Sequence, residues 1–171
     1  MASGPKIAIT GFMGVGKSSV ARHLSRLLRV NRLDLDVEIQ RSQNRSIAEM
    51  IDNEGIGRYR EIETATLARV LGGRAPDIIS LGGGAWTIEE NRRMLKEHEF
   101  TTLWLDAPFE HCWLNISFSK KDRPLARDKS SAKRLFDERQ MIYCLAEWHF
   151  FVRPDQTSLE IARQIRDEIF S

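Results

Sequence analysis

The stretch that decides the fold of this 171-residue chain is Gly11-Phe12-Met13-Gly14-Val15-Gly16-Lys17-Ser18. It matches the pattern G-x-x-x-x-G-K-[ST], with an apolar run at residues 6–10 before it and an amphipathic segment at residues 17–29 after it. In a loop of this kind, backbone N–H groups turn toward phosphate oxygens and the following helix adds its positive N-terminal end. The alternative is a glycine-rich turn with an incidental lysine, which would require neither the strand nor the helix. The loop therefore predicts a nucleoside triphosphate site.

The loop also assigns a contact to each of its polar side chains. The Lys17 ammonium group can reach the β- and γ-phosphates, and the Ser18 hydroxyl can bind Mg²⁺. We expect the triphosphate to be held by the end of the loop and the first turn of the helix, which are Gly14, Val15, Gly16, Lys17, Ser18 and Ser19.

Short apolar runs alternate with longer amphipathic segments along the rest of the chain. Strands are expected at residues 6–10, near 34, at 77–81, at 101–105 and at 148–152. Helices are expected at residues 17–29, 37–42, 47–51, 58–71, 88–97, 130–147 and 157–170. Thr87 is the expected N-cap of the helix at 88–97, and Pro108 lies near the start of a further helix. Five strands that alternate with helices imply one α/β domain, residues 1–171, with a parallel sheet covered on both faces.

The polar segment 117–131 interrupts this alternation. It is rich in charged residues, contains Pro124 and offers few apolar anchors. We expect it to be a mobile lid rather than a domain linker, in which the Arg123 cation could swing over a triphosphate.

Composition and charge exclude several classes of protein. Lys and Arg number 26 and Asp and Glu number 24, so the net charge of +2 provides no broad basic face for nucleic acid. Apolar runs are far shorter than the roughly 20 residues that span a bilayer, and no leader is expected at the N-terminus. Cys112 and Cys144 are too few for a disulfide framework, and no Cys/His spacing resembles a zinc site. We expect a cytoplasmic protein that binds neither nucleic acid nor membrane.

Asp34-Leu35-Asp36 places two carboxylates at the expected end of the second strand. Residues i and i+2 of a strand face the same way, so both side chains would point into the crevice beside the phosphate loop. One carboxylate could support Mg²⁺ through water while the other accepts a proton from a substrate hydroxyl. The alternative is a helix N-cap followed by an acid in the first helical turn. The position, shortly after a phosphate loop, favours the functional interpretation.

Three further features are ambiguous when each is taken alone. Gly82-Gly83-Gly84 follows a buried strand, and it is either a flexible turn or a close approach of the backbone to a ligand. Arg60 and Arg139 each lie on a charged helical segment, where most arginines are solvated.

The order of these motifs resembles the shikimate kinase family over nearly the full length of the chain. The matching pieces are Gly-Phe-Met-Gly-Val-Gly-Lys-Ser-Ser at 11–19, Leu-Asp-Leu-Asp at 33–36, Arg-Ser-Ile-Ala-Glu at 45–49, Tyr-Arg-Glu-Ile-Glu at 59–63, Leu-Gly-Gly-Gly-Ala at 81–85 and Arg-Pro-Leu at 123–125. The phosphate loop alone indicates only a superfamily, whereas the combination is specific to this family.

The resemblance implies a three-layer α/β/α P-loop kinase with strand order 2-3-1-4-5, acting as a monomer. The implied reaction is transfer of the ATP γ-phosphoryl group to the 3-hydroxyl of shikimate, assisted by Mg²⁺, in aromatic amino acid biosynthesis. Lys17 would contact the phosphates, and Ser18 would contact both the phosphates and the metal. Asp34 would support the metal through a water molecule. Arg123 would close over the ATP phosphates.

The same resemblance implies which residues would bind shikimate, the acceptor of the phosphoryl group. Asp36 would orient the substrate hydroxyls and accept the proton. Arg60 and Arg139 would hold the shikimate carboxylate, and backbone N–H groups of Gly82, Gly83 and Gly84 would complete that pocket. The implied catalytic residues are Lys17, Asp36 and Arg123.

Two departures from the family pattern motivate alternatives. Ile56 replaces an acid that usually precedes the Tyr59-Arg60 pair, and residues 112–117 offer no arginine for the adenine side. One alternative is a kinase of another small metabolite such as gluconate. Another is a non-catalytic protein that has kept the fold, against which the intact phosphoryl-transfer residues argue.

Overall fold

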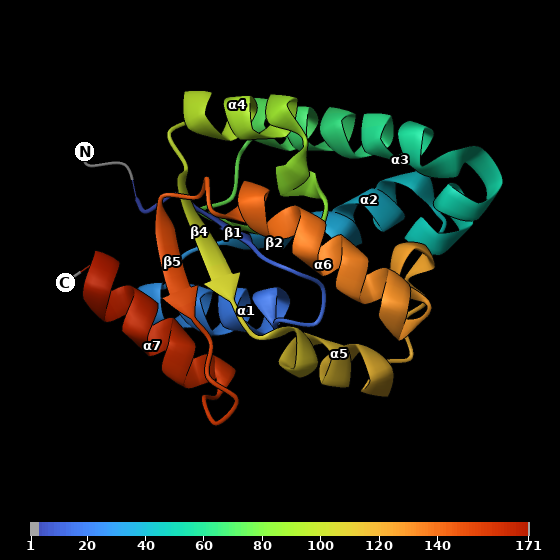
Figure 1. Ribbon diagram of the computed structural model, residues 1–171. Coiled ribbons are helices and arrows are strands. Elements are labelled where there is room, and N and C mark those ends of the chain that lie inside the picture. The colour runs from blue at the N-terminus through green and yellow to red at the C-terminus, as the bar shows by residue number, and fades with distance from the viewer. Residues whose placement is uncertain (1–3, 171) are drawn as a thin grey trace.

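Five parallel strands form the centre of the computed structural model, which describes residues 4–170 (Figure 1). The strands are β1 (Ile7–Thr10), β2 (Arg32–Asp34), β3 (Ile78–Ser80), β4 (Thr101–Asp106) and β5 (Trp148–Phe151). Their order in the sheet is β2-β3-β1-β4-β5, and every neighbouring pair is parallel. The predicted strand order 2-3-1-4-5 is therefore confirmed.

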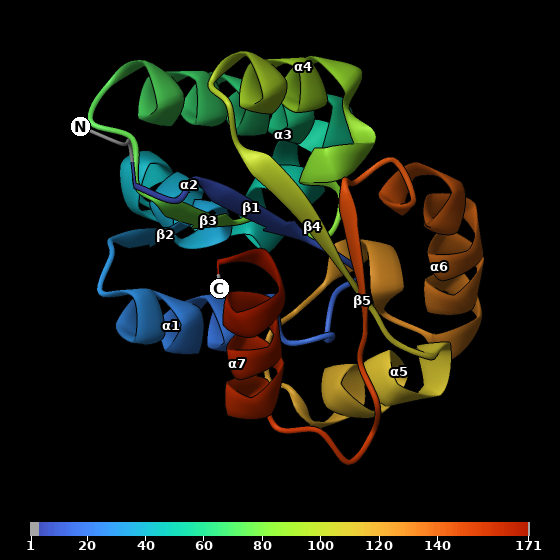
Figure 2. The ribbon, with the colours of Figure 1, turned by 90° about the vertical axis from the view of Figure 1, so that its left-hand side faces the viewer.

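Helices cover both faces of this sheet (Figure 2). The α-helices are α1 (Lys17–Leu28), α2 (Leu35–Gln43), α3 (Ile47–Gly72), α4 (Glu89–Glu97), α5 (Phe109–Phe118), α6 (Lys129–Tyr143) and α7 (Ser158–Ile169). Two short 3₁₀ helices, η1 (Ala85–Thr87) and η2 (Pro124–Ala126), lie between them. In both ribbon views α1 and α7 lie side by side on one face and α3 and α4 on the other. The predicted α/β/α layering is confirmed.

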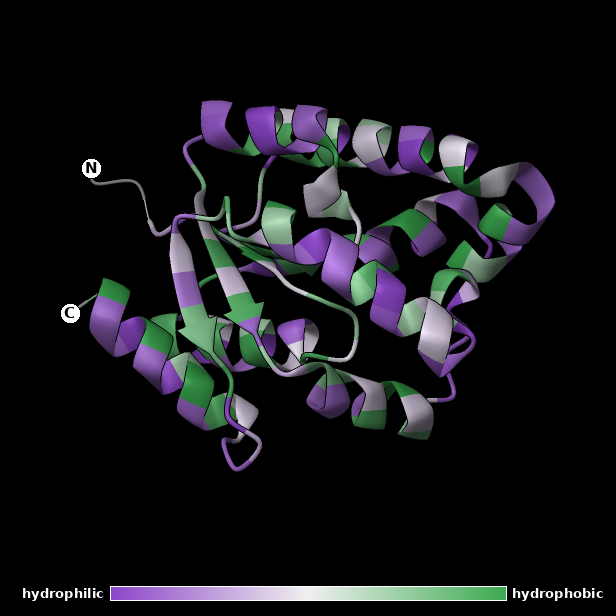
Figure 3. Ribbon diagram, in the orientation of Figure 1, coloured by the Kyte–Doolittle hydropathy of each residue, from purple (hydrophilic) through white to green (hydrophobic). Residues whose placement is uncertain are grey.

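Apolar residues of the strands and of the inward helix faces form the core. β1 is buried along its whole length, because β3 and β4 flank it and helices cover both its faces. On α1 the buried residues Val20, Ala21 and Leu24 recur at helical spacing, as on any helix with one face against a sheet. Figure 3 shows the same amphipathic pattern on α7, where green and purple alternate around the helix. Within residues 4–170 no helix is both long and apolar enough to span a bilayer.

The helix α3 joins the two segments expected to be helical, residues 47–51 and 58–71, through a kink, so the expected break is present but residues 52–57 are added to the helix. A capping box starts this helix, with Ser46 and Glu49 each accepting a hydrogen bond from the other's backbone N–H. At Gly55 the backbone has φ 85° and ψ 165°, so the helix is kinked there. The polar residues around this glycine interrupt the apolar pattern, which is why the sequence indicates a break.

Two helix boundaries also differ from the predictions. Thr87 does not cap α4, because its hydroxyl donates to the Gly84 carbonyl at 2.6 Å within η1 and Ile88 occupies the N-cap position. Helix α6 ends at Tyr143 rather than at residue 147. Beyond it, Leu145 N–H donates to the Ile142 carbonyl at 3.0 Å, a tight turn that leads the chain into β5.

The loop between α5 and α6 is shorter than the predicted polar segment 117–131. Helix α5 extends to Phe118, and α6 begins at Lys129 with Asp128 as its N-cap. Residues 119–128, which include η2, are named the α5–α6 loop below.

Gly55→Ala and Gly57→Ala are expected to change stability in opposite directions. A Cβ atom would meet nothing within 4 Å at either position, so only the backbone distinguishes them. Alanine at position 55 must adopt a positive φ, which should lower the free energy of unfolding by about 1–3 kcal/mol. Alanine at position 57, inside regular helix, should raise it by up to about 1 kcal/mol. Urea unfolding measures both values, and equal effects would contradict the kink.

Candidate active site

A cleft of about 840 Å³ opens where the carboxyl ends of β1, β2 and β3 meet α3, α6 and the α5–α6 loop. Residues that lie far apart in the sequence line it together. Every site residue predicted from the sequence is among them: Gly14, Val15, Gly16, Lys17, Ser18, Ser19, Asp34, Asp36, Arg60, Gly82, Gly83, Gly84, Arg123 and Arg139.

Lys17 begins α1 and is buried at the floor of this cleft. Its Nζ donates to the Gly11 carbonyl at 2.8 Å and to the Phe12 carbonyl at 3.0 Å, so the ammonium group is held by its own loop. Burial lowers the pKa of Lys17 to about 8, and the carboxylates of Asp36 and Asp34 oppose this shift. A buried cation whose charge is only partly compensated by nearby carboxylates favours the binding of an anion.

Asp34 connects the second strand to the phosphate loop. Its Oδ2 accepts a hydrogen bond from the Ser18 hydroxyl, and its Oδ1 accepts one from Val37 N–H at 3.2 Å. It is therefore the N-cap of α2 while it also contacts the predicted metal-binding serine.

Asp36 corrects the strand argument made for the Asp34-Leu35-Asp36 motif. The strand β2 ends at Asp34, and Asp36 lies in the first turn of α2. Both carboxylates still line the cleft, because α2 begins directly at the strand end. Helical rather than strand geometry brings them there, so the N-cap alternative is correct for Asp34 and both carboxylates lie in the cleft.

The three consecutive glycines after β3 make room for three charged side chains. A Cβ on Gly82 would lie 3.1 Å from Asp36 Cγ and closer still to Oδ1. A Cβ on Gly83 would lie 3.2 Å from Arg139 Nη1, and one on Gly84 would overlap the Arg60 guanidinium, 2.6 Å from its Cζ. This segment is thus a point of close approach rather than a flexible turn.

Arg60 is fixed by a buried acid that sequence analysis did not single out. Its Nη1 lies 2.8 Å from Oε1 of Glu63, one helical turn later on α3, and the Glu63 side chain is 1% exposed. Burial raises the pKa of Glu63, while the Arg60 guanidinium beside it opposes that rise. The Tyr59 hydroxyl also donates to Glu63, at 3.3 Å. The i, i+3 spacing from Arg60 was the available signal for this residue.

Arg139 is buried on α6 and is held by a tyrosine one turn later. Tyr143 lies beside the guanidinium, and its hydroxyl donates to the Gly83 carbonyl. Within residues 4–170 the Nη1 atom of Arg139 has no hydrogen-bond partner. Burial lowers the pKa of Arg139, and the nearby Arg60 cation adds to this effect. Two neighbouring guanidinium groups could bind a planar anion such as a carboxylate.

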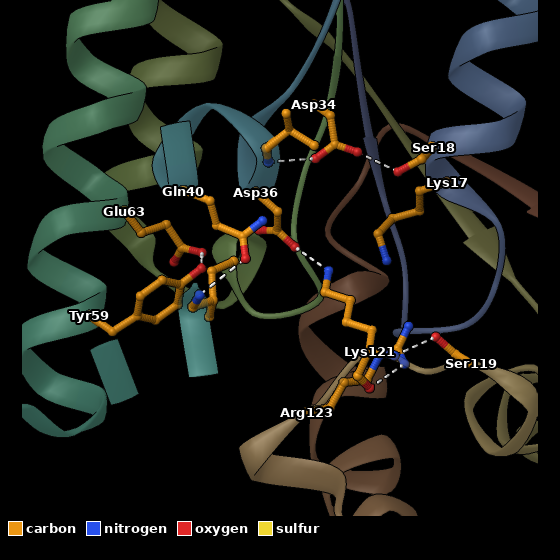
Figure 4. A network of polar contacts seen from close by, with 12 residues as sticks. Lys17, Ser18, Asp34, Asp36, Gln40, Tyr59, Glu63, Ser119, Lys121 and Arg123 are labelled. Atoms are coloured by element: carbon orange, nitrogen blue, oxygen red, sulfur yellow. Dashed lines mark hydrogen bonds and ion pairs between the residues drawn. The ribbon is translucent and has the colours of Figure 1, made fainter. Parts of the chain in front are cut away.

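The α5–α6 loop brings two cations toward the cleft (Figure 4). Arg123 Nη1 donates to the Lys121 carbonyl at 3.5 Å, and Lys121 Nζ lies 3.6 Å from Asp36 Oδ2. Lys121 is half exposed in a polar loop, and no motif in the sequence distinguishes it from its neighbours.

Wild-type protein is expected to gain stability relative to Lys17→Met as the pH rises from about 8 to 10.5. In this window the unfolded chain binds a proton at Lys17 that the folded chain has released, so rising pH favours folding. The difference in unfolding free energy should increase by up to about 3 kcal/mol. Urea unfolding of both proteins across the window measures it, and a flat or falling difference would contradict the buried ammonium.

Comparisons with known proteins agree with one another. The family model described as shikimate kinase matches residues 13–170. The shikimate kinase of Cereibacter sphaeroides is 38% identical over 144 residues, which is 82% of this chain and 71% of that protein. The shikimate kinase of Ruegeria pomeroyi is 36% identical over 157 residues, 90% of this chain and 78% of that protein.

A solved structure extends the comparison to three dimensions. Shikimate kinase from Acinetobacter baumannii in complex with shikimate matches with a TM-score of 0.88 at 28% identity, over 98% of this chain and 93% of that chain. The phosphate loop, the strand order and the cleft at the carboxyl ends of the strands thus have a common explanation. The chain belongs to the shikimate kinase family.

Proposed function

We propose that this protein transfers the γ-phosphoryl group of ATP to the 3-hydroxyl of shikimate, giving shikimate 3-phosphate for aromatic amino acid biosynthesis. The observation that carries the proposal is the meeting of Asp36, Arg60 and Arg139 at the triple glycine, beside the phosphate loop. This arrangement provides a carboxylate for a hydroxyl group and two guanidinium groups for an acid. Shikimate carries both groups.

ATP would bind along the phosphate loop, with backbone N–H groups of residues 14–19 around its phosphates. Lys17 would exchange its hydrogen bonds with the loop carbonyls for bonds to the β- and γ-phosphates, which compensates its buried charge. Arg123 would approach the same phosphates from the α5–α6 loop. Burial already lowers the pKa of Arg123, and the Asp36 carboxylate opposes this.

The residues beside the loop fit a magnesium ion. Ser18 and Asp34 place a hydroxyl and a carboxylate oxygen in contact, and hard oxygen donors of this kind suit Mg²⁺. No group of three or more His, Cys, Asp or Glu within residues 4–170 is arranged for a metal, as expected where phosphates and water supply the other ligands. When bound, Mg²⁺ would neutralise charge on the phosphates.

The acceptor carboxylate would bind between Arg60 and Arg139. Glu63 pairs with the Arg60 guanidinium, and Nη1 of Arg139, which has no hydrogen-bond partner among residues 4–170, would donate to the ligand. Backbone N–H groups near Gly83 add further donors. Charge-assisted and bidentate hydrogen bonds of this kind fix both the position and the orientation of the acceptor.

Asp36 would face the acceptor hydroxyl. Its Oδ1 is buried and lacks a hydrogen-bond partner among residues 4–170, so it is free to accept from that hydroxyl. The hydroxyl oxygen attacks the γ-phosphorus, the bond to the ADP oxygen breaks, and the hydroxyl proton passes to Asp36. Most of the rate enhancement comes from in-line positioning and charge neutralisation. Closure of the α5–α6 loop would exclude water, which would otherwise accept the phosphoryl group. We expect the enzyme to act as a cytoplasmic monomer.

Purified protein is expected to release ADP with shikimate, and far more slowly with gluconate or nucleoside monophosphates. Arg60→Lys should raise the KM for shikimate about 10-fold or more, because lysine cannot reproduce the bidentate contact. Arg58→Lys is the matched control, since Arg58 also pairs with a glutamate three residues later on α3 but faces solvent. A coupled assay of ADP release measures both. Faster turnover of a nucleoside monophosphate than of shikimate, or equal effects of the two variants, would refute the proposal.

A further inference from the structure

We propose that Lys121 is a second catalytic cation of the α5–α6 loop, which contacts the γ-phosphoryl group as it passes from ATP to the acceptor. The inference rests on the function proposed above and adds a residue to it.

The Lys121 ammonium group lies at the point where transfer would take place. Its Nζ is 3.6 Å from Oδ2 of Asp36, the residue that faces the acceptor hydroxyl. Figure 4 shows it reaching between Asp36 and Lys17, the residue that serves the phosphates. The γ-phosphoryl group must travel between the phosphate side and the hydroxyl side of the cleft. A cation that lies between Asp36 and Lys17 would therefore contact the transferred phosphoryl group.

The charges that face Lys121 fit an anion in this position. Lys121 and Lys17 both line the cleft, and the Lys121 ammonium group lies 3.6 Å from Oδ2 of Asp36. Two cations on the same side of a cleft both gain when a phosphoryl group binds between them. Burial lowers the pKa of Arg123, and the Asp36 carboxylate raises it against this effect. The loop therefore presents two cations to one region of the cleft.

Local contacts hold this part of the loop in place. Lys121 N–H donates to the Ser119 hydroxyl at 3.2 Å, and the Lys121 carbonyl accepts from Arg123 Nη1 at 3.5 Å. The next residue, Asp122, accepts from Arg127 at 3.0 and 3.1 Å, and Arg127 also donates to Asp52 on α3 at 2.7 Å. These exposed contacts bring the loop beside the helix that carries Arg60, and Lys121 lines the cleft.

The ion pair with Asp36 does not prevent Lys121 from turning to a phosphoryl group. The Lys121 side chain is 48% exposed and the Asp36 side chain 22% exposed. Partly exposed pairs at this distance contribute little to stability. An arriving triphosphate carries several negative charges, so it attracts the ammonium group more strongly than one carboxylate does.

The test compares Lys121→Met with Lys120→Met, with Lys121→Arg as the conservative variant. Lys120 is the adjacent exposed lysine and does not line the cleft. Lys121→Met should lower kcat with shikimate about 10- to 100-fold, and change the KM for shikimate less than about threefold. It should also weaken binding of ATP more than binding of ADP, measured by isothermal titration. Lys121→Arg should keep most of the rate, and Lys120→Met should match wild type.

Three results would overturn the proposal. One is an equal loss of kcat in Lys121→Met and Lys120→Met. A second is a rise of kcat/KM in Lys121→Met, which would make Lys121 an obstacle at Asp36. The third is an unchanged ratio of ATP to ADP affinity in Lys121→Met. Failure of the proposed function is distinguishable, since wild type would then bind ATP without phosphorylating shikimate. In that case the ATP to ADP ratio alone decides whether Lys121 contacts the γ-phosphoryl group.

Discussion

Three charged side chains from three different helices meet at the end of β3 because residues 82–84 carry no side chains of their own. Asp36 from α2, Arg139 from α6 and Arg60 from α3 each occupy space that a Cβ would fill. The contact fixes how closely these helices approach the sheet at its carboxyl edge. It also fixes the distance between the carboxylate and the two guanidinium groups, and hence the shape of ligand that the cleft accepts.

Burying these cations in the cleft costs desolvation free energy, which a bound anion would offset. Lys17 is buried with a lowered pKa, and Arg139 keeps an unpartnered donor within residues 4–170. Glu63 compensates Arg60 and itself has a raised pKa through burial. Buried charges that lack full compensation are expected where the missing partner is an anionic substrate. Under the proposed function, a triphosphate and a carboxylate would supply those partners in one cleft.

The sequence predicts most of this site because its motifs follow local rules. The phosphate loop lies between a strand and a helix, and its spacing indicates the site by itself. Asp36 was predicted for the wrong reason, since a strand argument placed a residue that α2 positions. The break within α3 was also predicted, because the polar residues around Gly55 interrupt the apolar periodicity and the backbone is kinked at that glycine. Lys121 could not be found at all, because its role depends on how the α5–α6 loop folds back over Asp36.

The absence of a side chain at Gly84 leaves room for the guanidinium group of Arg60, which we propose binds the acceptor carboxylate. Gly84 has φ −107° and ψ −9°, so alanine fits its backbone, and the three atoms nearest to the added Cβ all belong to the Arg60 guanidinium. The most direct measurement is therefore the KM of Gly84→Ala for shikimate. We expect this KM to rise about 10-fold or more, with the KM for ATP and the thermal unfolding midpoint close to wild type. An unchanged KM for shikimate would contradict this proposal.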